Sequence, residues 1–308
     1  MTNDLQAFEC VWSVAMWRLA ERMLDDLNRV LRARGIRVFM VYGTFLGAVR
    51  HRGVIPWDDD IDVGIFGEDE SRLLHAQGDL REIGYQLQQH VIPWDQTPLS
   101  YYKVWIASRP SDTGYFYSWP FVDIWVFRAT GRLNEITEGD LYYQRSDILP
   151  LKSYPFGNLF LDGPSDDTIL RRAYGADYLD TCVSSYLNHR EEKRLTPVSK
   201  SRAEVQQHGY FVQIHTRDSV HDGSTLTRNP AYQLRCSNAG NDLISSTGDV
   251  LPITPTMAAL WNLSNGRRTI RDCLEQLSAE WSRPVIDLVE DVYSSVHALH
   301  THGAVHLS

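Results

Sequence analysis

The chain has 308 residues, 43% of them hydrophobic and 22% charged, which is typical of an ordered globular protein with a sizeable core. The formal net charge of -9 argues against broad, sequence-independent binding to nucleic acid. The four cysteines lie far apart without a C-x-x-C pair, so neither a disulfide framework nor a structural zinc site is expected. Because no apolar run has the length of a membrane span and the N-terminus lacks a signal-peptide pattern, we expect a cytoplasmic protein.

The first part of the chain alternates helical and strand patterns. Apolar residues at steps of three and four predict one long helix or two shorter ones over residues 5–34, ended by Gly35. Strands are predicted at 36–42, 61–66, 85–91, 100–106 and 121–127, and helices at 44–50 and 69–83. This order is typical of an α/β fold.

The composition changes after residue 186. Residues 189–223 are polar and charged and are interpreted as a connecting segment, and residues 224–308 as a compact second domain. In that domain, strands are predicted at 232–236 and 242–246, helices at 255–263, 270–281 and 285–300, and an extended piece at 303–306. The sequence therefore predicts two domains, with the first at 1–188.

The most informative segment covers residues 42–63 and reads YGTFLGAVRHRGVIPWDDDIDV. A strand ending at Gly43 and Thr44 places backbone N–H groups and a hydroxyl at a helix N-terminus, which suits a phosphate. Asp60 and Asp62 alternate with apolar residues, so both carboxylates lie on one face of a strand. Neighbouring carboxylates repel unless a cation lies between them, and oxygen ligands favour Mg²⁺ or Mn²⁺, which commonly bridge nucleotide phosphates.

A third carboxylate has a similar setting. Asp123 is the only charge in the apolar strand FVDIWVF at 121–127. Burial of an unpaired carboxylate is costly, so Asp123 is expected to have a metal ion or a cationic partner. An acidic run such as 58–62 is most often a solvated turn, but the interleaved apolar residues and the third carboxylate favour a metal site.

Residues 43–62 resemble the signature of the LicD family, which includes bacterial phosphocholine transferases and fukutin-related ribitol-phosphate transferases. The family pattern is roughly G-T-L-L-G-A-V-R-H-x-G-F-I-P-W-D-D-D-x-D, and the chain follows it almost position for position. Lys103 and Asp123 lie in strands that also resemble the family, although the family reads D-I-F-P where this chain reads D-I-W-V. The run RAYGADY at 172–178 resembles the closing element R-x-Y-G-D-x-W, and the resemblance covers roughly residues 20–190.

This resemblance implies a nucleotidyltransferase-like fold, a mixed sheet with flanking helices, in which two or three carboxylates hold Mg²⁺ or Mn²⁺. Carried over by position, Asp60, Asp62 and Asp123 bind the metal, and Asp123 is preferred as the group that deprotonates the acceptor. Asp58 binds metal or positions water. The residues expected to contact the donor phosphates or the transferred group are Gly43, Thr44, Arg50, Arg52 and Lys103. The alternative for the three cations is an ordinary surface role.

Residues 225–308 resemble PqqD-like domains, small winged-helix units that recognise peptides in peptide-modifying systems. The similarity lies in LPITPTMAALW at 251–261, NGRRTI at 265–270 and GAV at 303–305. A sheet with a free edge can accept an extended peptide as an added strand. The alternatives are a helical domain that caps or dimerises the enzyme, and a DNA-binding winged helix, which the acidic last helix disfavours.

The leading hypothesis is a metal-dependent transferase that moves a nucleotidyl or substituted phosphoryl group from an NTP or CDP-linked donor to a hydroxyl acceptor. The second resemblance points to a leader-bound ribosomal precursor peptide as that acceptor. One alternative is transfer of phosphocholine or a polyol phosphate to a cell-envelope glycan. A non-catalytic peptide-binding scaffold is the other, and the carboxylates count against it. The donor, the acceptor and the oligomeric state are left open.

Overall fold

The computed structural model describes residues 4–92, 99–111, 114–138, 141–191, 193–211, 222–237 and 240–308. Backbone contacts divide the chain into two units. One consists of residues 1–13 and 20–215, and the other of residues 14–19 and 216–308. Most of the predicted connecting segment groups with the first unit, and its residues 192 and 212–221 lie outside the described residues.

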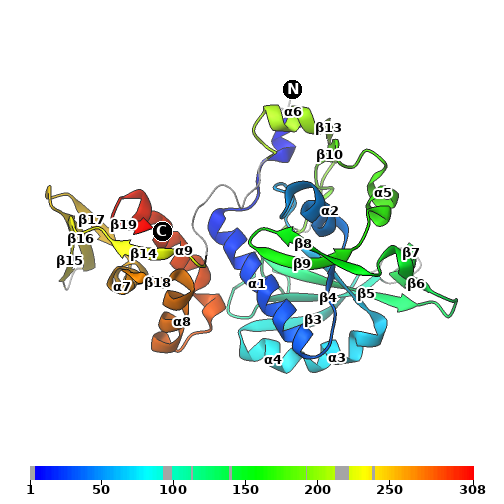
Figure 1. Ribbon diagram of the computed structural model, residues 1–308, viewed down its shortest axis with the longest axis horizontal. Coiled ribbons are helices and arrows are strands. Elements are labelled where there is room, and N and C mark those ends of the chain that lie inside the picture. Colours follow the sequence, from blue (N-terminus) through cyan, green and yellow to red (C-terminus); the bar gives the residue numbers. More distant parts are fainter. Residues whose placement is uncertain are drawn as a thin grey trace. The chain divides into compact units, whose positions relative to one another are not determined.

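The first unit is built on a mixed sheet with the strand order β1-β2-β5-β4-β3, from which β6 and β7 extend beside β5 (Figure 1). The strands are β1 Phe39–Met40, β2 Asp62–Phe66, β3 Tyr85–Ile92, β4 Leu99–Ile106, β5 Phe121–Ala129, β6 Glu135–Glu138 and β7 Leu141–Gln144. The β2 and β5 strands run parallel, whereas β5 and β4, like β4 and β3, run antiparallel. The predicted mixed α/β class is confirmed.

Helices flank this sheet. In the view of Figure 1, α3 and α4 lie on one side of it and α2 and α5 on the other. The helical elements are η1 Asp4–Phe8, α1 Val14–Ala33, α2 Tyr42–His51, η2 Gly67–Asp69, α3 Glu70–His75, α4 Gln77–Glu82, η3 Arg145–Asp147, α5 Thr168–Tyr174 and α6 Arg202–Gln207. The predicted helix over 5–34 is thus a 3₁₀ turn followed by α1, and the one over 69–83 is divided at Ala76.

Gly35 ends α1 as predicted. Its φ of 70° is left-handed, and the N–H of Ile36 donates to the carbonyl of Leu31, a bond that satisfies a helix-end acceptor. The strand that follows is shorter than predicted, because Val41 already has the extended conformation of a helix N-cap and α2 begins one residue later.

The described part of the first unit also contains a hairpin and two short strand pairs. Its hairpin joins β8 Leu151–Phe156 to β9 Leu159–Pro164. The short pairs are β10 Thr181–Val183 with β13 Ser199–Ser201, and β11 Leu187–Asn188 with β12 Lys193–Arg194. Residues predicted to be an irregular connection therefore form ordered pairs within this unit.

The core under β2 depends on one glycine. A Cβ on Gly64 would lie 2.5 Å from the ring of Phe39 and 2.9 Å from that of Phe127. Because Gly64 has no side chain, these two rings pack 5.4 Å apart, centroid to centroid, across the strand. Each side chain of β2 is buried, so the strand that begins at Asp62 is held firmly.

Among its described residues, the second unit combines two small antiparallel sheets with three α-helices (Figure 1). Its strands are β14 Thr225–Arg228, β15 Tyr232–Ser237, β16 Gly240–Ser245, β17 Val250–Ile253, β18 Asn265–Thr269 and β19 Val305–Leu307. Its helical elements are α7 Pro255–Leu263, α8 Ile270–Trp281, η5 Val285–Asp287 and α9 Val289–Thr301. The predicted elements are present, with the helix over 285–300 interrupted at Leu288. The winged-helix assignment stays a prediction.

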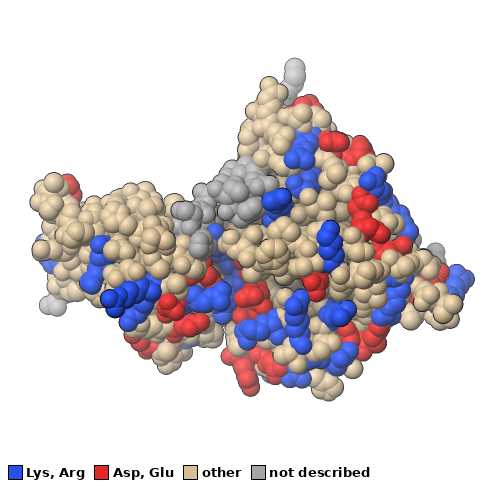
Figure 2. Space-filling view, in the orientation of Figure 1, with Lys and Arg blue, Asp and Glu red and all other residues tan. Residues whose placement is uncertain are grey.

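Charged side chains of both signs are interspersed over the face of the first unit that Figure 2 shows. The ion pairs of this unit include the two-bond contact of Arg34 with Asp79 (2.6 and 2.7 Å) and that of Arg32 with Asp162 (2.9 Å). Among the described helices, none combines the length and the apolar character needed to cross a membrane.

Candidate active site

Three predicted site residues lie side by side on the central strands. In the parallel pair of β2 and β5, Asp62 is in register with Asp123, and in the antiparallel pair of β5 and β4, Asp123 is in register with Lys103. All three side chains are buried, with Asp62 6%, Asp123 2% and Lys103 1% exposed. The structure therefore brings together carboxylates from segments about sixty residues apart.

Asp123 has the cationic partner that its burial demands. The Nζ atom of Lys103 lies 2.8 Å from Oδ1 and 2.9 Å from Oδ2 of Asp123. Aromatic rings surround the ammonium group, with the Phe121 centroid 3.4 Å and the Tyr117 centroid 4.4 Å from Nζ. Burial raises the pKa of Asp123, and Lys103 offsets part of that rise. Lys103, predicted to contact the phosphoryl group, is thus engaged within the protein.

Two hydrogen bonds fix Asp62. Its backbone N–H donates to Oγ1 of Thr44 (2.7 Å), and the indole N–H of Trp125 donates to its Oδ1 (2.7 Å). Thr44 lies in the first turn of α2 and is buried, so its hydroxyl holds the start of β2 rather than facing solvent. Trp125 stands where the family pattern has phenylalanine, and this departure from the pattern supplies a donor to the carboxylate.

Two glycines of the motif let the loop over 52–61 lie against α2. A Cβ on Gly43 would be 2.5 Å from Oδ2 of Asp58, and one on Gly47 would be 2.4 Å from the carbonyl oxygen of Gly53. A side chain at Gly47 would therefore displace the backbone of this loop, and one at Gly43 would displace the carboxylate of Asp58. The predicted phosphate contact of Gly43 stays a prediction, whereas its close approach to Asp58 is part of the fold.

Indole N–H groups hold the backbone of the same loop. Trp12 donates to the carbonyl of Asp58 (2.6 Å), and Trp119 donates to the carbonyl of Asp59 (2.7 Å). In addition, the hydroxyl of Ser185 donates to Oδ1 of Asp58 (3.0 Å). The aspartate loop is consequently preorganised, as a charged site requires.

The two predicted arginines have different surroundings. Arg50 is buried, and its Nη1 donates to the carbonyls of Tyr178 (3.1 Å) and Thr181 (2.8 Å). Burial lowers its pKa. Arg52 is exposed and ends α2 in a left-handed conformation with a φ of 56°. Arg50 therefore holds the segment after α5. Arg52 lies at the surface, as its alternative interpretation from the sequence expected.

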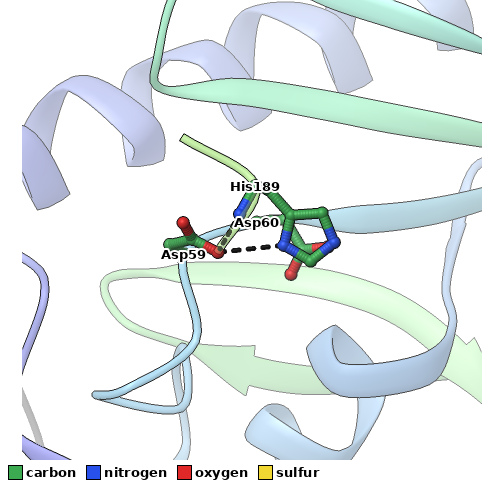
Figure 3. A group of neighbouring side chains, drawn as sticks. All are labelled: Asp59, Asp60 and His189. Carbon is green, nitrogen blue, oxygen red and sulfur yellow. Dashed lines mark hydrogen bonds and ion pairs between the residues drawn. The ribbon is translucent and has the colours of Figure 1, made fainter. Parts of the chain in front are cut away.

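A histidine that the sequence left in the connecting segment belongs to the site (Figure 3). Nδ1 of His189 lies 2.9 Å from Oδ1 of Asp59, and its Nε2 lies 3.2 Å from Oδ2 of Asp60. One ligand atom from each of Asp59, Asp60 and His189 lies within 4.8 Å of the others, close enough to share a metal ion. A lone histidine in a polar run carries no signal by which sequence reasoning could have found it.

Mutual repulsion is visible in the carboxylate pKa values. Burial and the charges of neighbouring aspartates raise the pKa of both Asp60 and Asp62 to about 7, and that of Asp58 well above its ordinary value. Burial disfavours the charged form of His189, but Asp60 and Asp59 outweigh it and raise its pKa to about 10. Such concentrated negative charge is characteristic of a cation-binding functional site.

Two tyrosines lie close to these carboxylates. Desolvation and the charges of Asp58, Asp60 and Asp62 raise the pKa of the Tyr174 and Tyr186 hydroxyls. Both residues keep exposed surface, 40% for Tyr174 and 65% for Tyr186. Tyr174 is the tyrosine of the predicted closing motif, so that motif lies at the site.

The residues present fit a divalent cation. Asp60 and Asp62 offer oxygen ligands, and burial together with the neighbouring carboxylates raises the pKa of both, so a cation between them would favour their charged forms. Within the described residues, Oδ1 of Asp123 receives no hydrogen bond of suitable geometry, although Lys103 lies beside it. A buried carboxylate oxygen without a well-aligned hydrogen-bond donor, within a cluster of carboxylates, is consistent with a metal-binding site.

The sequence of the first unit is similar to known proteins. Residues 35–166 match the family model LicD/FKTN/FKRP, nucleotidyltransferase domain. An uncharacterized protein of Rickettsia typhi is 30% identical over 162 residues, which make up 50% of this chain and 46% of that protein. The chain thus spans less than half the length of this relative.

Two further relatives have named activities. The ribitol 5-phosphate transferase FKRP of Homo sapiens is 27% identical over 143 residues, 44% of this chain and 27% of that protein. The lipopolysaccharide cholinephosphotransferase LicD of Haemophilus influenzae is 53% identical over 52 residues, 17% of this chain and 20% of that protein. Both names agree with the predicted class of enzyme, a phosphotransferase. The predicted LicD resemblance is confirmed, and residues 35–166 are a LicD-family domain.

Proposed function

We propose that the protein transfers a substituted phosphoryl group, a polyol phosphate or phosphocholine, from a nucleotide-linked donor to a hydroxyl group of a glycan. The observation that carries this proposal is the preorganised cluster of Asp58, Asp60, Asp62 and Asp123 inside the LicD-family segment. The names of both relatives favour this transferred group, and that of the Haemophilus protein favours a glycan acceptor over the precursor peptide that the sequence had placed first.

The carboxylates have separate roles in this proposal. Asp60 and Asp62 hold a divalent metal ion, and Asp123 contributes its charge from the buried pair with Lys103. When bound, the ion neutralises the donor phosphates and polarises the phosphorus–oxygen bond that breaks. Asp62 is aimed by Trp125 and Thr44, so its position does not depend on substrate.

Proton removal from the acceptor hydroxyl is assigned to Asp58. The sequence favoured Asp123 as the base, but the Asp123 carboxylate is paired with the ammonium group of Lys103, which makes it a weaker proton acceptor. Asp58 is partly exposed, and burial together with Asp60 raises its pKa, which makes it a stronger base than an ordinary carboxylate. Ser185 orients one of its oxygens.

Arg190 is the cation that we assign to the donor phosphates. Its backbone N–H donates to Oδ2 of Asp59 (3.1 Å), and its guanidinium carbon lies 4.2 Å from the centroid of the Trp119 ring. A guanidinium that contacts a ring through its face can direct its N–H groups at phosphate oxygens. Lys103 and Arg50, the cations predicted for this role, are engaged by Asp123 and by backbone carbonyls.

A donor screen tests the proposal. CDP-choline, CDP-ribitol and the four nucleoside triphosphates are incubated with the protein, a divalent metal and a lipopolysaccharide oligosaccharide, and the products are resolved by mass spectrometry. Release of CMP together with a phosphate-substituted oligosaccharide is the expected result. Release of pyrophosphate from a triphosphate would show nucleotidyl transfer instead, and would overturn the proposed group.

A precursor-peptide acceptor remains a second candidate because of the sheet formed by β15, β16 and β17. In the part of the chain that the structure describes, β15 and β17 each pair only with β16, so each has an edge at which an extended peptide could add. Adding a serine- and threonine-containing peptide library to the same reactions distinguishes the acceptors. A phosphate-substituted peptide without a modified oligosaccharide would favour this candidate.

A further inference from the structure

We propose that His189 is a ligand of the metal at this site, bound through Nε2, and that its nitrogen makes the site prefer first-row transition ions over Mg²⁺. The inference rests on the metal site of the proposed function but not on the reaction carried out there. It begins with the role of Asp59, the residue between the two aspartates that face the site.

Asp59 is fully occupied in holding His189. Its Oδ1 accepts from the ring Nδ1 (2.9 Å) and the backbone N–H (3.3 Å) of His189, and its Oδ2 accepts from the backbone N–H of Arg190 (3.1 Å). Its carbonyl accepts from the indole of Trp119. Asp59, which is only 5% exposed, fixes the ring of His189 in place (Figure 3).

This contact decides which ring nitrogen is free for a metal. Because the carboxylate of Asp59 accepts from Nδ1, that nitrogen keeps its proton, and Nε2 is the atom that can give up its proton to a metal ion and act as the ligand. A carboxylate that orients a histidine by its second nitrogen is a recurrent support for histidine ligands of metals. Asp59 is therefore a positioning residue for the nitrogen ligand.

Nε2 points at the metal-binding carboxylates. It lies 3.2 Å from Oδ2 of Asp60, a separation compatible with two ligands that share one ion at roughly 2.0–2.2 Å each. His189 also lowers the pKa of Asp62 and of Asp123, so its ring lies within electrostatic reach of both. The nitrogen thus completes a donor set of carboxylate oxygens and one imidazole.

The chemistry of that set determines the preference among ions. Mg²⁺ favours oxygen ligands and near-octahedral geometry, whereas imidazole favours ions such as Co²⁺ and Zn²⁺ and is accepted by Mn²⁺. Oxygen ligands alone already bind ions late in the first row somewhat more tightly than Mg²⁺, and a histidine that ligates enlarges this difference.

The test reads the ligand directly and needs no turnover. The full chain is loaded with Mn²⁺ and studied by electron spin echo envelope modulation, which detects a nitrogen bound to the ion. Wild-type protein is expected to show ¹⁴N modulation that is lost in His189→Ala and in His189→Gln and kept in His75→Ala, a change at an exposed histidine of α3. Asp59→Asn should keep the modulation.

Affinities supply the second readout. His189→Ala should weaken Co²⁺ binding by at least the roughly 10- to 100-fold expected for a supporting residue of a metal site, and should change Mg²⁺ binding much less. Asp59→Asn should weaken Co²⁺ binding to a smaller extent. Wild-type protein that binds Mn²⁺ without ¹⁴N modulation would overturn the inference and identify His189 as a structural ion-pair partner only. If modulation is present and no donor is turned over, the proposed function fails and this inference stands.

Discussion

The substitution Lys103→Met tests whether Lys103 stabilises the fold or binds the substrate. The Lys103 and Asp123 side chains are both almost fully buried, with Nζ 2.8 Å from Oδ1, and removal of one partner leaves the other charge buried without compensation. Breaking a buried pair in this way costs about 3–5 kcal/mol of unfolding free energy. For a unit of some 200 residues, that loss corresponds to a fall in Tm of about 6–20 °C.

The assay is denaturant and thermal unfolding followed by tryptophan fluorescence at several pH values. Asp123 has a raised pKa in the folded protein, so its charge destabilises the fold increasingly as pH rises above the ordinary carboxyl pKa. Removing Lys103 raises the pKa of Asp123 further. The free energy of unfolding that Lys103→Met loses should therefore be larger at pH 8 than at pH 5.

The double variant Lys103→Met with Asp123→Asn is the control, because it removes both charges and should recover much of the stability lost in the single variant. If Lys103→Met unfolds within about 1 kcal/mol of wild type, the range of an exposed ion pair, the structural reading is refuted. Lys103 would then return to the phosphate-binding role that its sequence position suggested.

The remaining predictions concern the site and the thiols. Trp125→Phe restores the family residue but removes the donor to Asp62, so the transfer rate should fall by about tenfold or more in steady-state kinetics, with little effect on Tm. A Trp125→Phe enzyme with wild-type kinetics would show that the hydrogen bond does not aim Asp62. Arg190→Ala should raise the KM for the donor and leave metal affinity unchanged, whereas an equal loss in exposed Arg194→Ala would argue against a specific phosphate contact. Burial raises the pKa of Cys273 to about 11, so a maleimide at pH 8 should label exposed Cys236 and spare Cys273 until the protein is unfolded, as peptide mass spectrometry can show.

Elements bounded by strong local signals were predictable. The helices α7 and α8 begin and end where the sequence places them, because Thr254 and Thr269 are N-caps whose side chains accept hydrogen bonds from the first turn. The length of strand β1 was overestimated, because the apolar run continues into the buried first turn of α2. Hydrophobicity alone does not distinguish a buried strand from a buried helical turn.

The candidate site was predictable in composition but only partly in arrangement. The alternation around Asp60 and Asp62 and the isolated charge of Asp123 identified the carboxylates, and the same reasoning required a partner for Asp123. That the partner is Lys103 depends on the register between β4 and β5, which no local pattern records. The contact of His189 with Asp59 spans 130 positions of sequence and depends on tertiary structure alone.

The central claim is that Asp60 and Asp62 form the centre at which the donor is cleaved. The most direct measurement is the single-turnover release of nucleoside monophosphate from the preferred donor at saturating metal, for wild type, Asp60→Asn, Asp62→Asn and the surface variant Asp79→Asn. The first two variants should lose about 100- to 1,000-fold in rate while keeping the wild-type circular dichroism spectrum, and Asp79→Asn should match wild type. Release at the wild-type rate by a folded Asp60→Asn or Asp62→Asn protein would contradict the account.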